Sequence, residues 1–99
     1  MTTNGQGTDH AWGGNHFLIG GQVRGGVMHG QFPELRVDGP NSISQNGAML
    51  PTSPWEAIWE PLVQWLGARP EQMANVFANH HRFPAEQLPN VTSVFEVAL

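Results

Sequence analysis

The sequence predicts an α/β fold, with short strands and a hairpin in the front half and one or two helices in the back half. Two changes along the chain indicate this. Residues 1–30 hold nine of the 12 glycines and no proline, whereas all eight prolines lie between residues 33 and 89. Glycine pairs punctuate short apolar runs in the front half, and an apolar repeat of helical period begins in the back half.

Strands are expected in the front half at residues 16–19, 22–24 and 27–29, which are short runs with β-branched or large apolar residues. The pair Gly25-Gly26 separates the last two runs. Because both glycines can adopt positive φ, this spacing predicts a β-hairpin. Residues 31–52 carry turn signals throughout and are expected to form an irregular crossing.

A helix is predicted over residues 54–66, because Ser53, Pro54 and Glu56 match an N-cap, a proline in the first turn and a capping box. Gly67 stands where a left-handed C-terminal cap is expected. Apolar and polar side chains then separate onto two faces, which predicts that the apolar face is the more buried. The expected buried residues are Trp55, Trp59, Leu62 and Leu66, and the expected exposed ones are Glu56, Glu60 and Gln64.

A second helix is predicted to begin at Pro70-Glu71 and to close near Asn79. The tail, residues 84–99, contains a weak alternation after Val91 that is typical of a strand. The chain is thus expected to be a single partial domain. Residues 1–30 form a glycine-rich loop and hairpin region, and residues 31–52 form the crossing. Residues 53–83 form the helical segment, and residues 84–99 form the tail.

Composition argues against several classes of protein. The formal net charge is −4 and lysine is absent, so binding to nucleic-acid phosphates is not expected. No apolar run approaches the roughly 18 residues of a membrane span. The front half supplies few apolar side chains to cover the tryptophan-rich helix. We therefore expect the remainder of a larger domain, or a partner, to cover Trp55, Trp59 and Trp65.

The densest polar cluster is the run Thr8-Asp9-His10 to His16. A carboxylate beside an imidazole, with a second imidazole six residues on, offers oxygen and nitrogen ligands that suit zinc, manganese or iron. Asp9, His10 and His16 are therefore the candidate metal ligands, and no catalytic residue is assigned. His80-His81 beside Arg82 is either a metal or anion site or a solvated loop after a helix, and the sequence alone favours the loop.

The string from Asn4 to Phe17, followed by Gly20-Gly21 and Gly25-Gly26, resembles the C-terminal portion of a large bacterial family. That family is named domain of unknown function fifteen-oh-one, and it is grouped with the alkaline phosphatases and sulfatases. The resemblance extends through Pro51-Thr52-Ser53 and the two helical segments to Phe83.

The resemblance implies that the chain is a C-terminal fragment of an alkaline-phosphatase-like domain. The parent would be an exported, metal-dependent hydrolase of phosphate or sulfate esters that holds zinc, manganese or calcium. Asp9 and His10 would bind a metal in that parent, and the fragment alone would be inactive and would hold no ion tightly. The alternatives are a non-catalytic exported binding or structural protein of the same fold, and a truncated reading frame without independent function.

Overall fold

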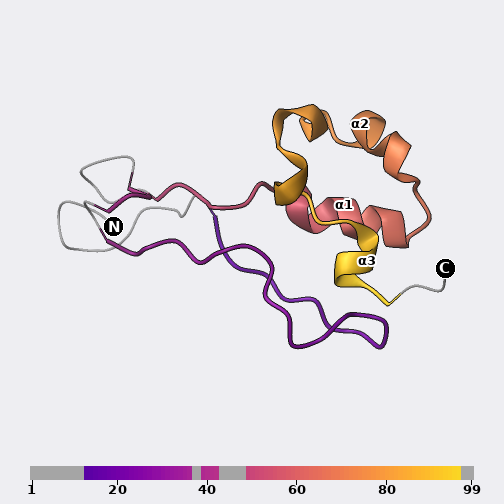
Figure 1. Cartoon of the computed structure of the whole chain (residues 1–99), viewed down its shortest axis with the longest axis horizontal. Helices are drawn as coiled ribbons and strands as arrows, with labels where there is room; N and C mark the ends of the chain where they lie inside the picture. Colours follow the sequence, from indigo (N-terminus) through magenta and orange to yellow (C-terminus); the bar gives the residue numbers. More distant parts are fainter. Residues whose placement is uncertain (1–12, 37–38, 43–48, 97–99) are drawn as a thin grey trace. The chain divides into compact units, whose positions relative to one another are not determined.

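The computed structural model describes residues 13–36, 39–42 and 49–96 (Figure 1). The chain divides into two compact units. We call the first, Met1–Phe17 with Gly30–Thr52, the turn-rich unit, and the second, Leu18–His29 with Ser53–Leu99, the helical unit. No helix among the described residues combines the length and the hydropathy that crossing a bilayer requires.

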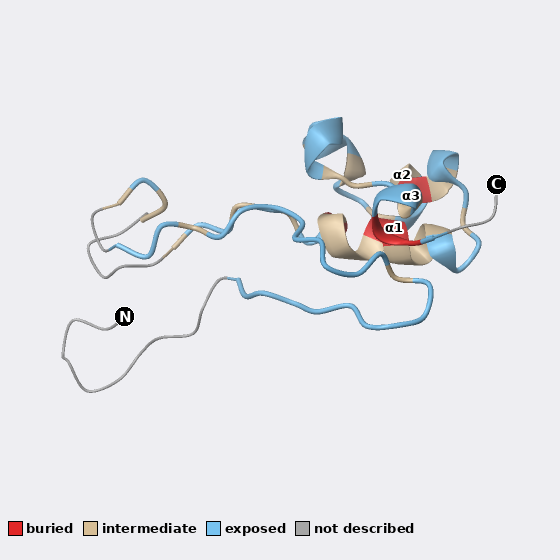
Figure 2. Cartoon of the chain, turned by 60° about the horizontal axis from the view of Figure 1, so that its bottom comes forward, coloured by how far each residue is buried: buried red, intermediate tan, exposed pale blue. Residues whose placement is uncertain are grey.

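The helical unit contains three short α-helices joined by 3-10 turns (Figure 1). Helix α1 packs against α3, and α2 packs against the turns before and after it, η1 and η2. The most buried apolar side chains are those of Pro61, Met73, Val94 and Phe95, with Met73 only 1% exposed. Buried residues are drawn in red in Figure 2. The elements are α1 (Glu56–Trp65), η1 (Pro70–Gln72), α2 (Met73–Val76), η2 (His80–Arg82), η3 (Ala85–Gln87) and α3 (Val91–Val94).

Helix α1 is two residues shorter at its start than the sequence predicts, and Ser53 is not its N-cap. Trp55 occupies the cap position in the right-handed helical region, without a side-chain cap bond. The first turn closes instead through backbone bonds from Ala57 N–H to Pro54 C=O (3.1 Å) and from Ile58 N–H to Trp55 C=O (3.2 Å). The helix therefore begins through backbone bonds of its first turn and without a serine side-chain cap.

The end of α1 confirms the expected glycine cap. Gly67 has a φ of 116°. Its N–H donates to Gln64 C=O, and Ala68 N–H donates to Val63 C=O, at 3.0 and 3.1 Å. This pair of bonds is a Schellman motif, in which a residue with positive φ lets the chain turn back onto the last helical carbonyls. The second predicted helix also begins where expected, as η1 followed directly by α2, but it ends at Val76.

The predicted α/β fold class is wrong. The described residues contain three short helices and no strand, so this part of the chain is mainly helical. The turn at Gly25-Gly26 forms, with Gly26 at a φ of 71°, but its two flanks do not pair with each other. Instead, Arg24 N–H donates to Val94 C=O (2.8 Å) and Glu96 N–H donates to Gln22 C=O (2.7 Å), around an isolated antiparallel bridge.

The expected strand after Val91 is also wrong, because residues Val91–Val94 form helix α3. Asn90 is its N-cap, and its side-chain oxygen accepts from Ser93 N–H at 3.1 Å. Residues of this type at the N-cap stabilise a helix by satisfying one of its free N–H groups. The cap outweighs the weak alternation of the tail, which spans too few residues to specify a strand.

The described part of the turn-rich unit is held by turns and short polar contacts. Leu50 N–H donates to Asn41 C=O at 2.8 Å, next to an isolated bridge between Ser42 and Met49. A Cβ placed on Gly13 would lie 2.9 Å from the ring of Pro51. The backbone at Gly13 therefore approaches Pro51 more closely than any other residue type would allow.

Candidate functional site

The predicted metal ligands are only partly described by the structure. Asp9 and His10 lie outside the described residues. His16 is described and is exposed on the surface of the turn-rich unit. Within residues 13–36, 39–42 and 49–96, no three His, Asp or Glu side chains lie close enough together to hold a metal ion.

The closest polar contact between helices of the helical unit joins α1 to η2. Glu60 Oε1 lies 2.7 Å from His80 Nδ1. The Glu60 side chain is 2% exposed and the His80 side chain 28% exposed. When Glu60 is ionised it can only accept hydrogen bonds, so the proton of this contact lies on Nδ1 of His80. In the neutral imidazole, Nε2 is then the nitrogen with a free lone pair.

His81 stands beside this pair on η2. Its ring centroid is 5.3 Å from that of His80, and the two ring planes meet at 70°. His81 is exposed, and no hydrogen bond from its ring to another described residue is present. Glu60, His80 and His81 thus form one small cluster.

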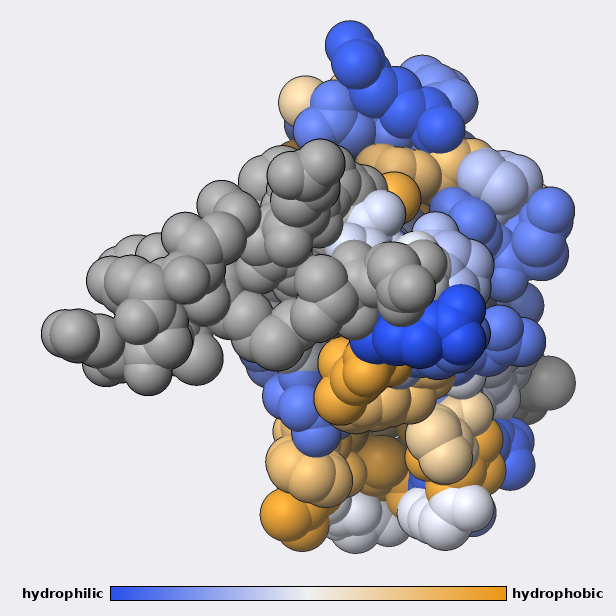
Figure 3. All heavy atoms as spheres, turned by 90° about the vertical axis from the view of Figure 1, so that its left-hand side faces the viewer, coloured by the Kyte–Doolittle hydropathy of each residue, from blue (hydrophilic) through white to orange (hydrophobic). Residues whose placement is uncertain are grey.

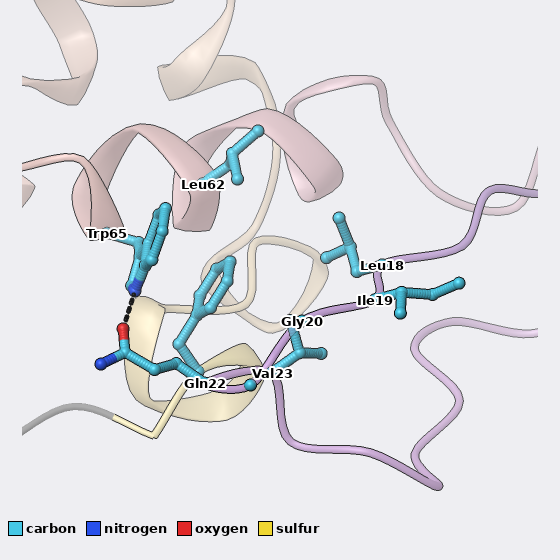
Figure 4. Close-up of a pocket in the computed structure, with 9 residues that line it drawn as sticks. Leu18, Ile19, Gly20, Gln22, Val23, Leu62 and Trp65 are labelled. Atoms are coloured by element: carbon cyan, nitrogen blue, oxygen red, sulfur yellow. Dashed lines mark hydrogen bonds between the residues drawn. The ribbon is translucent and has the colours of Figure 1, made fainter.

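An apolar hollow of about 320 Å³ lies elsewhere in the helical unit (Figure 4). Trp65 and Leu62 of α1 face it on one side and Leu18 and Ile19 on the other. Trp65 Nε1–H donates to Gln22 Oε1 at 3.0 Å, and the Trp65 ring stacks on Phe95 with centroids 5.1 Å apart. The amide oxygen of Gln22 is therefore already engaged. The hollow fits an apolar group and contains no titratable side chain.

The two ends of the apolar side of α1 are open to solvent, contrary to the sequence-based prediction, whereas Trp59 and Leu62 between them are half-buried. Trp55 is 66% and Leu66 is 71% exposed, whereas Glu56 and Glu60 are buried. The Trp55 ring lies against Trp59, with centroids 5.2 Å apart. Apolar residues also reach the surface elsewhere, as on the face of the molecule drawn in Figure 3. The prediction that the apolar side is the more buried is therefore wrong: Glu56 and Glu60 are the buried residues, and Gln64 is half-buried like Trp59 and Leu62.

Comparison of the chain with protein-family models, with curated proteins and with solved structures finds no match.

The pairing of Glu60 with His80 was missed by sequence reasoning. The step of four from Glu56 to Gln64 indicated a solvated helix face, and His80 indicated a solvated loop. No local pattern joins the two residues, since 20 positions separate them. Two neighbouring histidines directly after a short helix were the one available signal, and they did not point to Glu60.

Proposed function

We propose that this chain is the C-terminal segment of a metal-dependent hydrolase of phosphate or sulfate esters, and that it contributes Asp9 and His10 as ligands of one metal ion. The observation that carries the proposal is the string from Asn4 to Phe17, which resembles the family described above. No observation of comparable specificity favours the non-catalytic alternative.

The donor set fits this chemistry. A carboxylate oxygen next to an imidazole nitrogen suits zinc or manganese, and the glycines at positions 7, 13 and 14 allow neighbouring side chains to converge. A divalent ion in such a site stabilises negative charge on the oxygens of the ester. The role of Asp9 and His10 is to hold and orient that ion.

A complete site needs more ligands than this string offers, because catalytic zinc sites use about three protein ligands and a nucleophile in line with the leaving group. In the proposal, the other ligands and the nucleophile come from residues of the parent that precede the string. The described residues gather no group of three such ligands that would take their place.

The exposed side of α1 is consistent with a segment that belongs to a larger domain. Trp55 and Leu66 place apolar surface in water, and large exposed apolar patches are uncommon on independent monomers. In the proposal, the remainder of the parent domain covers this side of α1.

Activity assays test the proposal with two proteins, the 99-residue chain and a parent that includes the preceding residues. With chromogenic phosphate and sulfate esters, the parent is expected to show saturable turnover and the chain alone none. Asp9→Ala and His10→Ala in the parent should each lower the bound metal and the turnover, whereas His29→Ala, at an exposed position outside the string, should change neither.

Two results would contradict the proposal. Unchanged metal content in both Asp9→Ala and His10→Ala would remove these residues from the site. Turnover by the isolated chain that either substitution abolishes would show that the chain is a complete enzyme and not a segment of one.

A further inference from the structure

We propose that His80 and His81 form a second metal site that binds Zn²⁺ through both imidazoles. Glu60 positions His80 through its contact with Nδ1. This site belongs to the helical unit and is independent of the function proposed for Asp9 and His10. Its evidence is the contact between Glu60 and His80 and the geometry of the two rings.

The buried carboxylate prepares His80 for a metal. Glu60 is 2% exposed on α1, and its Oε1 lies 2.7 Å from His80 Nδ1. Metal-binding histidines commonly donate their second ring N–H to a carboxylate, which selects the tautomer, orients the ring and raises the basicity of the metal-binding nitrogen. With Nδ1 bonded to Glu60, Nε2 on the other side of Cε1 is the ring nitrogen that is left for a metal. Sequence reasoning, which took η2 for a solvated loop, had no means of showing this partner.

The separation of the two rings favours tetrahedral over square-planar coordination. Two imidazoles on one Zn²⁺, with bonds of about 2.0–2.1 Å and a tetrahedral angle, place their centroids roughly 5.2 Å apart. Two neighbouring positions of a square-planar Cu²⁺ site would bring the centroids to roughly 4.5 Å. The observed distance between His80 and His81 is 5.3 Å. This spacing is compatible with both imidazoles binding one tetrahedral Zn²⁺ ion.

The charges around the pair are mixed. Arg82 follows on η2 and is exposed, so its charge is largely screened by water. The Glu60 carboxylate is buried against Nδ1 of His80, so its attraction for a cation is screened less than that of an exposed charge. Two imidazoles leave the remaining coordination positions to water. The site should accordingly bind Zn²⁺ reversibly and more weakly than a site with three or four protein ligands.

The test is a Zn²⁺ titration of the 99-residue chain, made without a histidine tag. The titrated variant carries Asp9→Asn, His10→Ala, His16→Ala and His29→Ala, so that His80 and His81 are the only histidines left. Nitrogen NMR of the two imidazoles should show Zn²⁺ shifting Nε2 of His80 and one nitrogen of His81 together, while Nδ1 of His80 keeps its proton. Because Asp9 and His10 are absent from this variant, a failure here says nothing against the proposed hydrolase.

Two matched substitutions sharpen the titration. His81→Ala, at an exposed position, should weaken Zn²⁺ binding by at least tenfold without affecting the fold. Glu60→Gln should weaken it by about tenfold, which is the lower end of the effect of removing a carboxylate partner. Glu56→Gln, a buried glutamate one turn earlier on α1 with no contact to His80 found in the structure, is the control and should leave the affinity unchanged.

Four results would overturn the proposal. Zn²⁺ could shift only one ring, it could shift neither, or it could displace the proton on Nδ1 of His80. Equal affinity for His81→Ala and the variant from which it was made would do the same. An equal loss in Glu60→Gln and Glu56→Gln would remove Glu60 as the positioning residue, because a general loss of helix stability would then explain both.

Discussion

The two sides of α1 contrast in chemistry and in environment. The inward side carries Glu60 and Gln64, which bond to His80 and to the N–H of Val91 on the elements packed beside the helix. The outward side carries Trp55 and Leu66, and both are exposed. The comparison teaches that an amphipathic pattern identifies the apolar side of a helix but not the side that neighbouring elements cover.

Glu60 can occupy the inward side because its carboxylate has a partner in His80. Within the described residues, no buried side-chain nitrogen or oxygen lacks a hydrogen bond. A buried carboxylate costs several kcal/mol to desolvate, and its contact with an imidazole offsets much of this only when the geometry is good. The 2.7 Å contact between Glu60 and His80 meets that condition. Exposed tryptophan and leucine side chains on the outward side contribute little to the free energy of folding of the chain by itself.

The largest expected effect is the loss of the core that the short helices share. Met73 on α2 is 1% exposed, and Met73→Ala removes a buried side chain and leaves a cavity. Such substitutions cost about 2–5 kcal/mol, which is comparable with the whole free energy of unfolding of a small domain. Chemical denaturation followed by far-UV circular dichroism should therefore show most of the helical signal lost before denaturant is added.

Val76→Ala is the matched control for this measurement. Val76 lies on the same helix and is 51% exposed, so its substitution should change the free energy of unfolding by less than about 0.5 kcal/mol. Equal effects of the two substitutions would show that α2 is not packed as described.

The features that sequence reasoning predicted correctly are local ones. The existence of α1, its end at Gly67 and the start of the next helix at Pro70 depend on residues within one or two turns of each other. Gly67 could be predicted because only a residue that tolerates positive φ continues the chain there. All the residues that determine such a feature lie within a short stretch of the sequence, so the sequence alone is enough to predict it.

The features that it missed depend on distant partners. The segment around Val23 pairs with the tail around Phe95 and not with its neighbour across Gly25-Gly26. Burial of Phe95 and its stacking on Trp65 favour that pairing, and neither is visible in either segment alone. The Glu60 and His80 contact is missed for the same reason. Asp9 and His10 lie outside the described residues, so their role as ligands stays a prediction.

The second effect concerns the inward side of α1. His80→Leu removes the partner of Glu60 and leaves a buried carboxylate without a hydrogen bond, at a cost of about 1–3 kcal/mol. Replacing both residues, as Glu60→Leu with His80→Leu, removes the buried charge as well, and such exchanges are often neutral or stabilising. The double variant should therefore regain most of the stability that the single variant loses, as measured by urea denaturation.

A double variant that is less stable than His80→Leu alone would contradict this reading of the inward side. It would mean that Glu60 makes a favourable contribution that does not depend on His80. A cycle completed with Glu60→Leu alone separates the two cases, because it measures the interaction energy between the two side chains directly.

The smallest effect in the isolated chain is expected on the outward side, and its size should depend on which protein is measured. Leu66 is 71% exposed, so Leu66→Ser should change the free energy of unfolding of the 99-residue chain by less than about 0.5 kcal/mol. If the remainder of a parent domain covers this side of α1, the same substitution in the parent places a hydroxyl in an apolar contact and should cost about 1–3 kcal/mol. Arg69→Ser, which changes an exposed charged residue just beyond the end of α1, is the control and should have a small effect in both proteins. Thermal denaturation of the four variants decides between the two arrangements. Equal, small effects of Leu66→Ser in chain and parent would show that the outward side of α1 is solvent-exposed in the larger protein as well, and that the parent does not cover it.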